Sequence, residues 1–269
     1  MKAVPLFTIM TLGVVAFIVI AMAVSPHAEE RSNDKIGIIG AMEVEVNTLI
    51  EATDVEEVRE ICGTPYYSGT MNGRNVVIAQ CGMGKVNAGI CAQLMITEFN
   101  VKYVINSGTA GALDDRLEIG DLVISTDAVQ HDFDVSPLNP SEYDKGEIPY
   151  TGKYSFEADS GLIELAVRAA AECAPEVNMM QGRICTGDQF INSDEQKNAI
   201  TSQFGGLCCE MEGGAIAQVC YLNDTPFVII RAMADKADGT LPPDYSEFEK
   251  MAAQRSASIV QYMVFQFPE

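Results

Sequence analysis

Short apolar runs alternate with amphipathic stretches along most of this chain. Six runs, most of them rich in Val and Ile, have the length and composition of buried strands, at 35–42, 75–84, 101–111, 120–129, 182–191 and 225–235. Five stretches with helical spacing lie between or after them, at 43–50, 85–99, 160–172, 213–222 and 245–265. This alternation predicts an α/β domain with a mostly parallel sheet. Ligands of such domains bind at the carboxyl ends of the strands, so we expect the functional residues there.

The first 34 residues differ from the rest of the chain. An apolar run without a single charge extends from Val4 to Val24, with Lys2 before it and acidic residues after it. About 20 apolar residues suffice to cross a bilayer, and Ala23 could end a signal-peptide cleavage site. We therefore expect residues 1–34 to be a cleaved signal peptide or a membrane anchor with its linker. The domain 35–269 would then lie outside the cytoplasm, with a cytoplasmic location as the alternative.

Charge and cysteine content restrict the possible partners. The chain has 38 Asp and Glu residues against 17 Lys and Arg residues, a formal net charge of -21, which opposes binding to nucleic acids. Its 8 cysteines include no Cys-x-x-Cys pair and it has only 2 histidines, so a structural zinc site has few possible ligands. We expect most cysteines to be small core residues, although some could pair in an exported chain.

Two carboxylates stand where the helix at 213–222 is predicted to begin. Glu210 and Glu212 flank Met211, directly before Gly213. A helix N-terminus favours nearby negative charge by roughly 0.3 to 1 kcal/mol, which explains both glutamates without any function. In the functional alternative, the segment is extended and successive side chains point to opposite sides, so that one carboxylate faces a pocket while Met211 packs elsewhere.

Charged residues also end the last predicted strand. Arg231 and Asp235 follow the apolar run at 227–230, where a buried charge is expensive unless it is paired or functional. An aspartate in an apolar pocket has a raised pKa, so it can carry a proton near neutral pH and give it to a leaving group. The alternatives are an ion pair between Arg231 and Asp235, or a helix cap by Asp235.

Three further segments follow predicted strands. Glu45 stands at the start of the first predicted helix, as a ligand-facing carboxylate or a favourable first-turn charge. The glycines of 106–111 let the backbone approach a ligand, and Thr109 offers a hydroxyl, although no dinucleotide or phosphate-loop spacing is present. Phe190 could stack on a flat ligand or fill the core.

Five motifs, in this order, resemble the family of 5'-methylthioadenosine/S-adenosylhomocysteine nucleosidases. They are IGIIGAMEVEV, NSGTAG, GDQFIN, CEMEGGAIA and VIIRAMADKAD. The resemblance extends from Ile36 to about Val264. It implies a single α/β domain of the nucleoside phosphorylase type, a mixed sheet surrounded by helices, usually in a homodimer. It also implies hydrolysis of the bond between adenine and ribose in 5'-thio nucleosides, without a metal or an organic cofactor.

The resemblance implies a role for each matching residue. Glu45 would activate water, Asp235 would protonate adenine at N7, and Arg231 would orient the carboxylates. Glu212 would hold the ribose hydroxyls. The other matching positions line the substrate site: Met42, Thr109, Gly111, Phe190, Ile191 and Met211, which packs on the sugar. Two positions depart from the family, which commonly has Ser in place of Ala234 and of Thr109.

The chemistry of the bond agrees with this assignment and leaves three rivals. Cleavage builds positive charge on the ribose and negative charge on the departing base, so it requires an acid at the base and a carboxylate near the sugar. A nucleoside phosphorylase of the same fold would need basic residues around its phosphate. A hydrolase of another purine nucleoside, such as futalosine, also fits. A non-catalytic exported nucleoside-binding protein would not need both Glu45 and Asp235.

Overall fold

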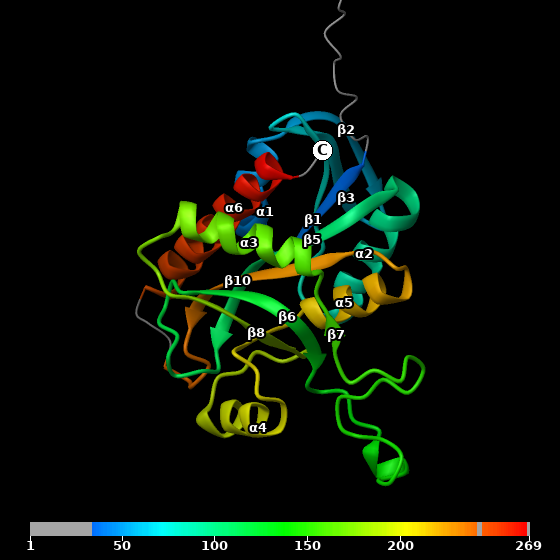
Figure 1. Ribbon diagram of the computed structural model, residues 1–269, viewed down its shortest axis with the longest axis vertical. Helices are drawn as coiled ribbons and strands as arrows, with labels where there is room; N and C mark the ends of the chain where they lie inside the picture. The colour runs from blue at the N-terminus through cyan, green and yellow to red at the C-terminus, as the bar shows by residue number, and fades with distance from the viewer. Residues whose placement is uncertain (1–33, 241–243, 268–269) are drawn as a thin grey trace, which may run out of the picture. The chain divides into compact units, whose positions relative to one another are not determined.

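A computed structural model describes residues 34–240 and 244–267 (Figure 1). The apolar run from Val4 to Val24, expected to be a signal peptide or an anchor, lies outside these residues. Within the described ranges, no helix combines the length and the apolar character that a membrane span requires.

The strands and helices alternate along the chain as predicted. The strands are β1 (Lys35–Gly40), β2 (Asp54–Ile61), β3 (Thr64–Met71), β4 (Arg74–Gln80), β5 (Val101–Ala112), β6 (Leu122–Gln130), β7 (Phe156–Glu157), β8 (Met179–Thr186), β9 (Cys208–Glu210) and β10 (Phe227–Asp235). The helices are α1 (Glu43–Glu51), α2 (Lys85–Phe99), the 3-10 turn η1 (Ser136–Leu138), α3 (Ser160–Cys173), α4 (Asp194–Phe204), α5 (Gly213–Leu222) and α6 (Tyr245–Gln266).

One mixed sheet organises the fold. Its strand order is β10-β6-β8-β9-β5-β1-β4-β3-β2, with β7 paired to β6. Because β10 also pairs in parallel with β5, strands β5, β10, β6, β8 and β9 close into a ring. The parallel strands β4, β1, β5 and β10 run side by side, so their carboxyl ends meet at one edge. The expected α/β domain with a mixed sheet is confirmed.

Helices cover both faces of the sheet, and alternating side chains supply a core to each. Helices α1, α3 and α6 lie on one face, and α2 and α5 lie on the other (Figure 1). Along β1, Ile38 packs in the core under α6 and Ile39 in the core under α2. On β5, Ile105 packs in the core under α6 and Val104 in the core under α2, because successive side chains of a strand point to opposite faces of the sheet.

All predicted strands and helices are present, but five elements lack a counterpart in the prediction. Strands β2, β3 and β7, helix α4 and the 3-10 turn η1 were not expected, whereas β9 falls in the segment that the functional alternative expected to be extended. Strand β2 has mostly exposed side chains, so its sequence contains no apolar run. Helix α4 buries only Lys197, Ile200 and Phe204. The predicted strand at 182–191 ends at Thr186, and Phe190 and Ile191 therefore lie in the loop beyond it.

The cysteines behave as expected for core residues. Six of them are buried and two, Cys62 and Cys173, are exposed, and all eight are free thiols.

Candidate active site

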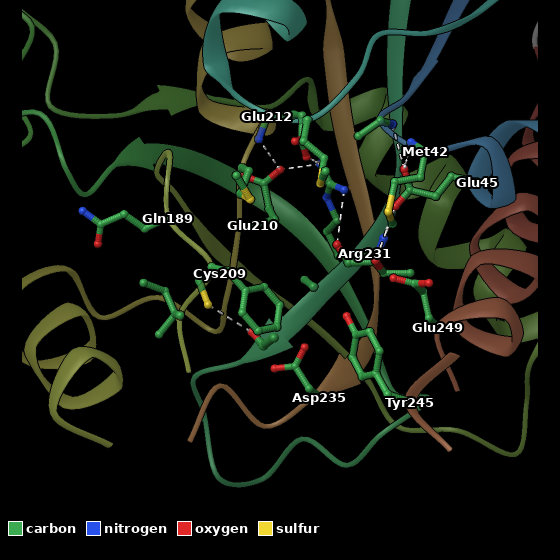
Figure 2. Close-up of a pocket in the computed structure, with 18 residues that line it drawn as sticks. Met42, Glu45, Gln189, Cys209, Glu210, Glu212, Arg231, Asp235, Tyr245 and Glu249 are labelled. Carbon is green, nitrogen blue, oxygen red and sulfur yellow. Dashed lines mark hydrogen bonds and ion pairs between the residues drawn. The ribbon is translucent and has the colours of Figure 1, made fainter. Parts of the chain in front are cut away.

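A cavity of about 180 Å³ opens at the carboxyl ends of the strands (Figure 2). All ten site residues predicted from the sequence line it: Met42, Glu45, Thr109, Gly111, Phe190, Ile191, Met211, Glu212, Arg231 and Asp235. They come from the loops after β1, β8 and β9, from the first turn of α1, which carries Glu45, and from the carboxyl-terminal halves of β5 and β10. The cavity thus lies at the edge of the sheet where the functional residues are expected.

Glu45 is fixed by hydrogen-bond donors on both carboxylate oxygens. Its Oε2 accepts from the backbone N–H groups of Ala41, at 2.7 Å, and Met42, at 3.0 Å. Its Oε1 accepts from the backbone N–H of Thr109 at 2.9 Å and from the Thr109 hydroxyl at 3.4 Å. The side chain is buried, 1% exposed, so its position is set by the protein and not by solvent.

A glycine on β5 makes this arrangement possible. A Cβ on Gly108 would lie 2.3 Å from Nη1 of Arg231 and 2.6 Å from Oε1 of Glu45. No side chain fits between these two groups, since carbon atoms do not approach other heavy atoms so closely in real structures. Gly108 therefore lets Glu45 and Arg231 approach β5 from the neighbouring elements.

Arg231 pairs with two glutamates, and the ion pair with Asp235 considered from the sequence does not form. Its Nη2 donates to Glu210, lies 3.5 Å from Glu212, and donates to the Asn106 side chain at 2.6 Å. Glu210 also accepts from the backbone N–H groups of Glu212, at 3.0 Å, and Gly213, at 2.7 Å. Such a buried charge pair is costly to break because the remaining charge would be left unpaired.

Glu210, Met211 and Glu212 all line the cavity, so the expectation that Met211 packs elsewhere is wrong. Strand β9 ends at Glu210, and Glu212 has φ -129° and ψ -43°, outside the extended conformation that would alternate the side chains. Oε1 of Glu212 accepts from the backbone N–H of Gly84 at 2.9 Å. Burial raises the pKa of Glu212 to about 7, although Arg231 opposes this shift and Glu210 adds to it.

Asp235 lies away from this network in the cavity (Figure 2). One of its oxygens accepts from the backbone N–H of Ala237 at 2.8 Å. Burial raises the pKa of the Asp235 carboxyl, the Ala237 N–H group partly opposes the shift, and the Asp238 charge adds to it. A Cβ at Gly111 would lie 2.7 Å from Oδ1 of Asp235, so this glycine leaves room for the carboxyl group. The group is therefore suited to hold a proton.

Sequence reasoning missed several residues of the cavity. They include Met83, Gln189, Cys209, Tyr245 and Glu249, whereas Glu210 was a candidate carboxylate without an assigned role. Tyr245 and Glu249 begin α6, four residues apart, and residues at that spacing share a helix face. This spacing in a correctly predicted helix was the available signal. No group of three or more His, Cys, Asp or Glu side chains among the described residues could hold a metal ion.

Known proteins share both the sequence and the fold of this chain. A model of the phosphorylase superfamily matches residues 35–264. The 5'-methylthioadenosine/S-adenosylhomocysteine nucleosidase of Shewanella denitrificans is 41% identical over 227 residues, which cover 84% of this chain and 96% of that protein. The chain belongs to this nucleosidase family.

Solved structures agree with that membership. The 5'-methylthioadenosine/S-adenosylhomocysteine nucleosidase of Neisseria meningitidis, in complex with methylthio-immucillin-A, superposes with a TM-score of 0.82 at 38% identity, over 87% of this chain and 100% of that chain. Futalosine hydrolase of Helicobacter pylori superposes with a TM-score of 0.81 at 32% identity, over 87% of this chain and 98% of that chain. The nucleosidase fold predicted from the five motifs is thereby confirmed.

Proposed function

We infer that this protein hydrolyses the N-glycosidic bond of 5'-methylthioadenosine and S-adenosylhomocysteine and releases adenine. One observation carries the inference: a single cavity holds one carboxylate surrounded by hydrogen-bond donors, Glu45, and one with a raised pKa, Asp235. These are the properties required of a general base and a general acid that act on opposite sides of one bond. Family membership supplies the substrate class.

Each group would have one task in the reaction. Asp235 gives its proton to N7 of adenine as the bond to the ribose breaks, and Glu45 takes a proton from the water that attacks the sugar. Glu212 accepts hydrogen bonds from the ribose hydroxyls and so fixes the sugar between these two groups. Arg231 holds Glu210 and Glu212 in place.

The charges of the cavity favour water over phosphate as the nucleophile. Among the residues that line the cavity, all of them in the described part of the chain, Arg231 is the one cation, and Glu210 and Glu212 already pair with it. Phosphate beside Glu45 would be repelled by about 4 kcal/mol per charge pair at 4 Å and an effective dielectric near 20. A phosphorylase site offers the opposite environment.

The test measures products from 5'-methylthioadenosine with and without phosphate. Full-rate adenine release in phosphate-free buffer, with free 5-methylthioribose as the second product, supports the hydrolase. Phosphate-dependent turnover or a sugar 1-phosphate product shows a phosphorylase. Binding of the nucleoside without any release of adenine shows a non-catalytic binding protein.

Futalosine is the second candidate substrate, because a futalosine hydrolase has nearly the same fold as this chain. Both hydrolases need the same acid and base, so the cavity carboxylates do not separate them. Comparison of kcat/KM for futalosine and for 5'-methylthioadenosine separates the two, and the larger value identifies the substrate class.

We further propose that the domain acts outside the cytoplasm. The run from Val4 to Val24 lies before the region 35–264 matched by the superfamily, and it has the length of a membrane span or an extended signal peptide. Cell fractionation and N-terminal sequencing test this proposal. Soluble cytoplasmic protein with Met1 intact refutes it.

We also propose a homodimer formed through α2 and α5. These helices pack together and carry exposed apolar side chains: Met83 just before α2, Val86 and Ile90 on α2, and Tyr221 and Leu222 on α5. A twofold axis would bury the same apolar surface on both copies.

Val86→Glu should shift the molar mass measured by light scattering to that of a monomer, whereas Val58→Glu, on exposed β2, should not. A monomeric wild type contradicts the proposal.

A further inference from the structure

Glu249 places a carboxylate in the active-site cavity that the proposed reaction does not use. It lies on α6, four residues after Tyr245, and both side chains line the cavity (Figure 2). In that reaction Asp235 protonates adenine, Glu212 binds the ribose hydroxyls and Glu45 activates the attacking water. Glu249 is therefore a charged cavity residue without a task in the cleavage itself.

Glu249 has the acidic neighbour Glu45 and no ion-pair partner in the described part of the chain. No Lys or Arg within residues 34–240 and 244–267 forms an ion pair with it. Partial burial raises the pKa of Glu249, the charge of Glu45 adds to the shift, and the Tyr245 hydroxyl opposes it. A half-buried carboxylate without a compensating cation is costly for the folded protein. A ligand that brings a donor or a positive charge would relieve this cost.

The negative charge extends over the cavity as a whole. Five carboxylates line it, from Glu45, Glu210, Glu212, Asp235 and Glu249, and only Arg231 opposes them. Arg231 is already paired with Glu210 and Glu212. The field of such a cavity favours ligands with positive groups and disfavours anions.

The roles of the other cavity residues indicate which part of the substrate Glu249 can contact. Adenine and the ribose hydroxyls are held by Asp235 and Glu212, which leaves the 5' substituent as the variable part of the substrate. The lining residues not used for base, hydroxyls or water include Met42, Met83, Tyr245 and Glu249. Two methionines suit a thioether, whereas a carboxylate suits a donor.

We propose that Glu249 is a specificity-determining residue that favours nucleosides whose 5' substituent carries a hydrogen-bond donor, an ammonium group above all, over nucleosides with a simple alkylthio group. The inference rests on the proposed nucleosidase function and extends it to the choice of substrate. Tyr245 assists by keeping Glu249 at the cavity.

A pair of nucleosides that differ only at the 5' position tests the proposal. The kcat/KM for 5'-amino-5'-deoxyadenosine is divided by that for 5'-methylthioadenosine, in the wild type and in Glu249→Gln and Glu249→Leu. A ratio removes changes that affect both substrates, such as a general loss of folded enzyme. We expect Glu249→Leu to lower the ratio by about tenfold or more, since a hydrogen bond between charged groups is lost. Glu249→Gln keeps an acceptor and should lower the ratio less.

Glu247→Gln is the matched control, because Glu247 lies on the same helix turn, is exposed and does not line the cavity. It removes the same charge from α6 and should leave the ratio within about twofold. A ratio unchanged in Glu249→Leu overturns the proposal, and so does an equal shift in Glu247→Gln, because the effect would then be a general field of the helix.

Calorimetric dissociation constants for the same two nucleosides, measured in Asp235→Asn to block turnover, provide a second readout. If the wild type releases adenine from neither nucleoside, the proposed function fails, while the ratio of dissociation constants still decides the role of Glu249. A ratio that does not change on Glu249→Leu overturns the specificity proposal even when hydrolysis is confirmed.

Discussion

The Glu45 and Asp235 regions of the cavity hold the same chemical group in opposite ways. Glu45 accepts four hydrogen bonds from Ala41, Met42 and Thr109, whereas Asp235 accepts one from Ala237. Both side chains are buried, at 1% and 4% exposure, so burial alone does not separate them. The number of hydrogen-bond donors does: four hold Glu45, whereas one holds Asp235, and burial raises the pKa of the Asp235 carboxyl.

This difference shows how one cavity can hold both a general base and a general acid. The donors to Glu45 are backbone N–H groups at the start of α1 and on β5, so the fold itself prepares the base. Asp235 is the last residue of β10 and faces the space that Gly111 leaves open. The following predictions test whether the contrast is catalytic.

The largest effect is expected from Glu45→Gln. An amide cannot take a proton from water, and its NH₂ group would face the backbone donors that now bind Glu45. We expect adenine release to fall by about 1,000-fold, within the usual range for loss of a general base. Steady-state assays of adenine release measure the effect. Glu43→Gln, an exposed neighbour on the same helix turn, should retain nearly full activity; equal losses in both variants would reduce Glu45 to a helix-start charge.

Asp235→Asn tests the acid. The amide keeps the size of the carboxyl group but has no proton to give to N7, so turnover should fall by about 100-fold or more. The dissociation constant for 5'-methylthioadenosine, measured by calorimetry, should change little. Asp238→Asn, in the same motif but outside the cavity, is the control. Near-normal turnover in Asp235→Asn would show that another group protonates the base.

A third buried carboxylate, Glu212, can be tested through the stability of the protein. It accepts a hydrogen bond from the Gly84 N–H group and pairs with Arg231. Burial raises its pKa from 4.5 to about 7, so between these values the folded protein binds a proton that the unfolded chain has released. The free energy of unfolding should therefore fall as pH rises from 5 to 8, by roughly 1 to 3 kcal/mol more in the wild type than in Glu212→Gln. Urea unfolding at both pH values measures this difference. Parallel pH dependence in the two proteins would contradict the raised pKa.

The smallest effect is expected from Thr109→Val. The substitution removes the hydroxyl 3.4 Å from Glu45 but keeps the backbone N–H group at 2.9 Å. We expect a loss of kcat of about threefold, because a long hydrogen bond contributes little. Thr109→Ser, which restores the family's common residue, should remain close to the wild type. A loss as large as that of Glu45→Gln would show that the hydroxyl, and not the backbone, holds the base.

The sequence alone determined the order of the main strands and helices and the edge of the sheet where the site lies. Strands such as β1 and β10 contain continuous apolar runs, at 36–40 and 227–230, and these runs indicate burial directly. Strand β2 and helix α4 escaped prediction because their exposed faces give no such pattern. All ten predicted site residues line one cavity, because five ordered motifs restrict the position of each residue.

Only the tertiary structure decided which charges pair. Arg231 and Asp235 are four residues apart on one strand, and the local pattern allowed them to form an ion pair. The ring of strands instead brings Glu210 from β9 against Arg231 of β10 and leaves Asp235 with one backbone donor. Glu249 joins the cavity only because α6 packs across β5 and β10. Such contacts join residues far apart in the chain, and pKa values and ion pairs depend on distances that local sequence patterns do not contain.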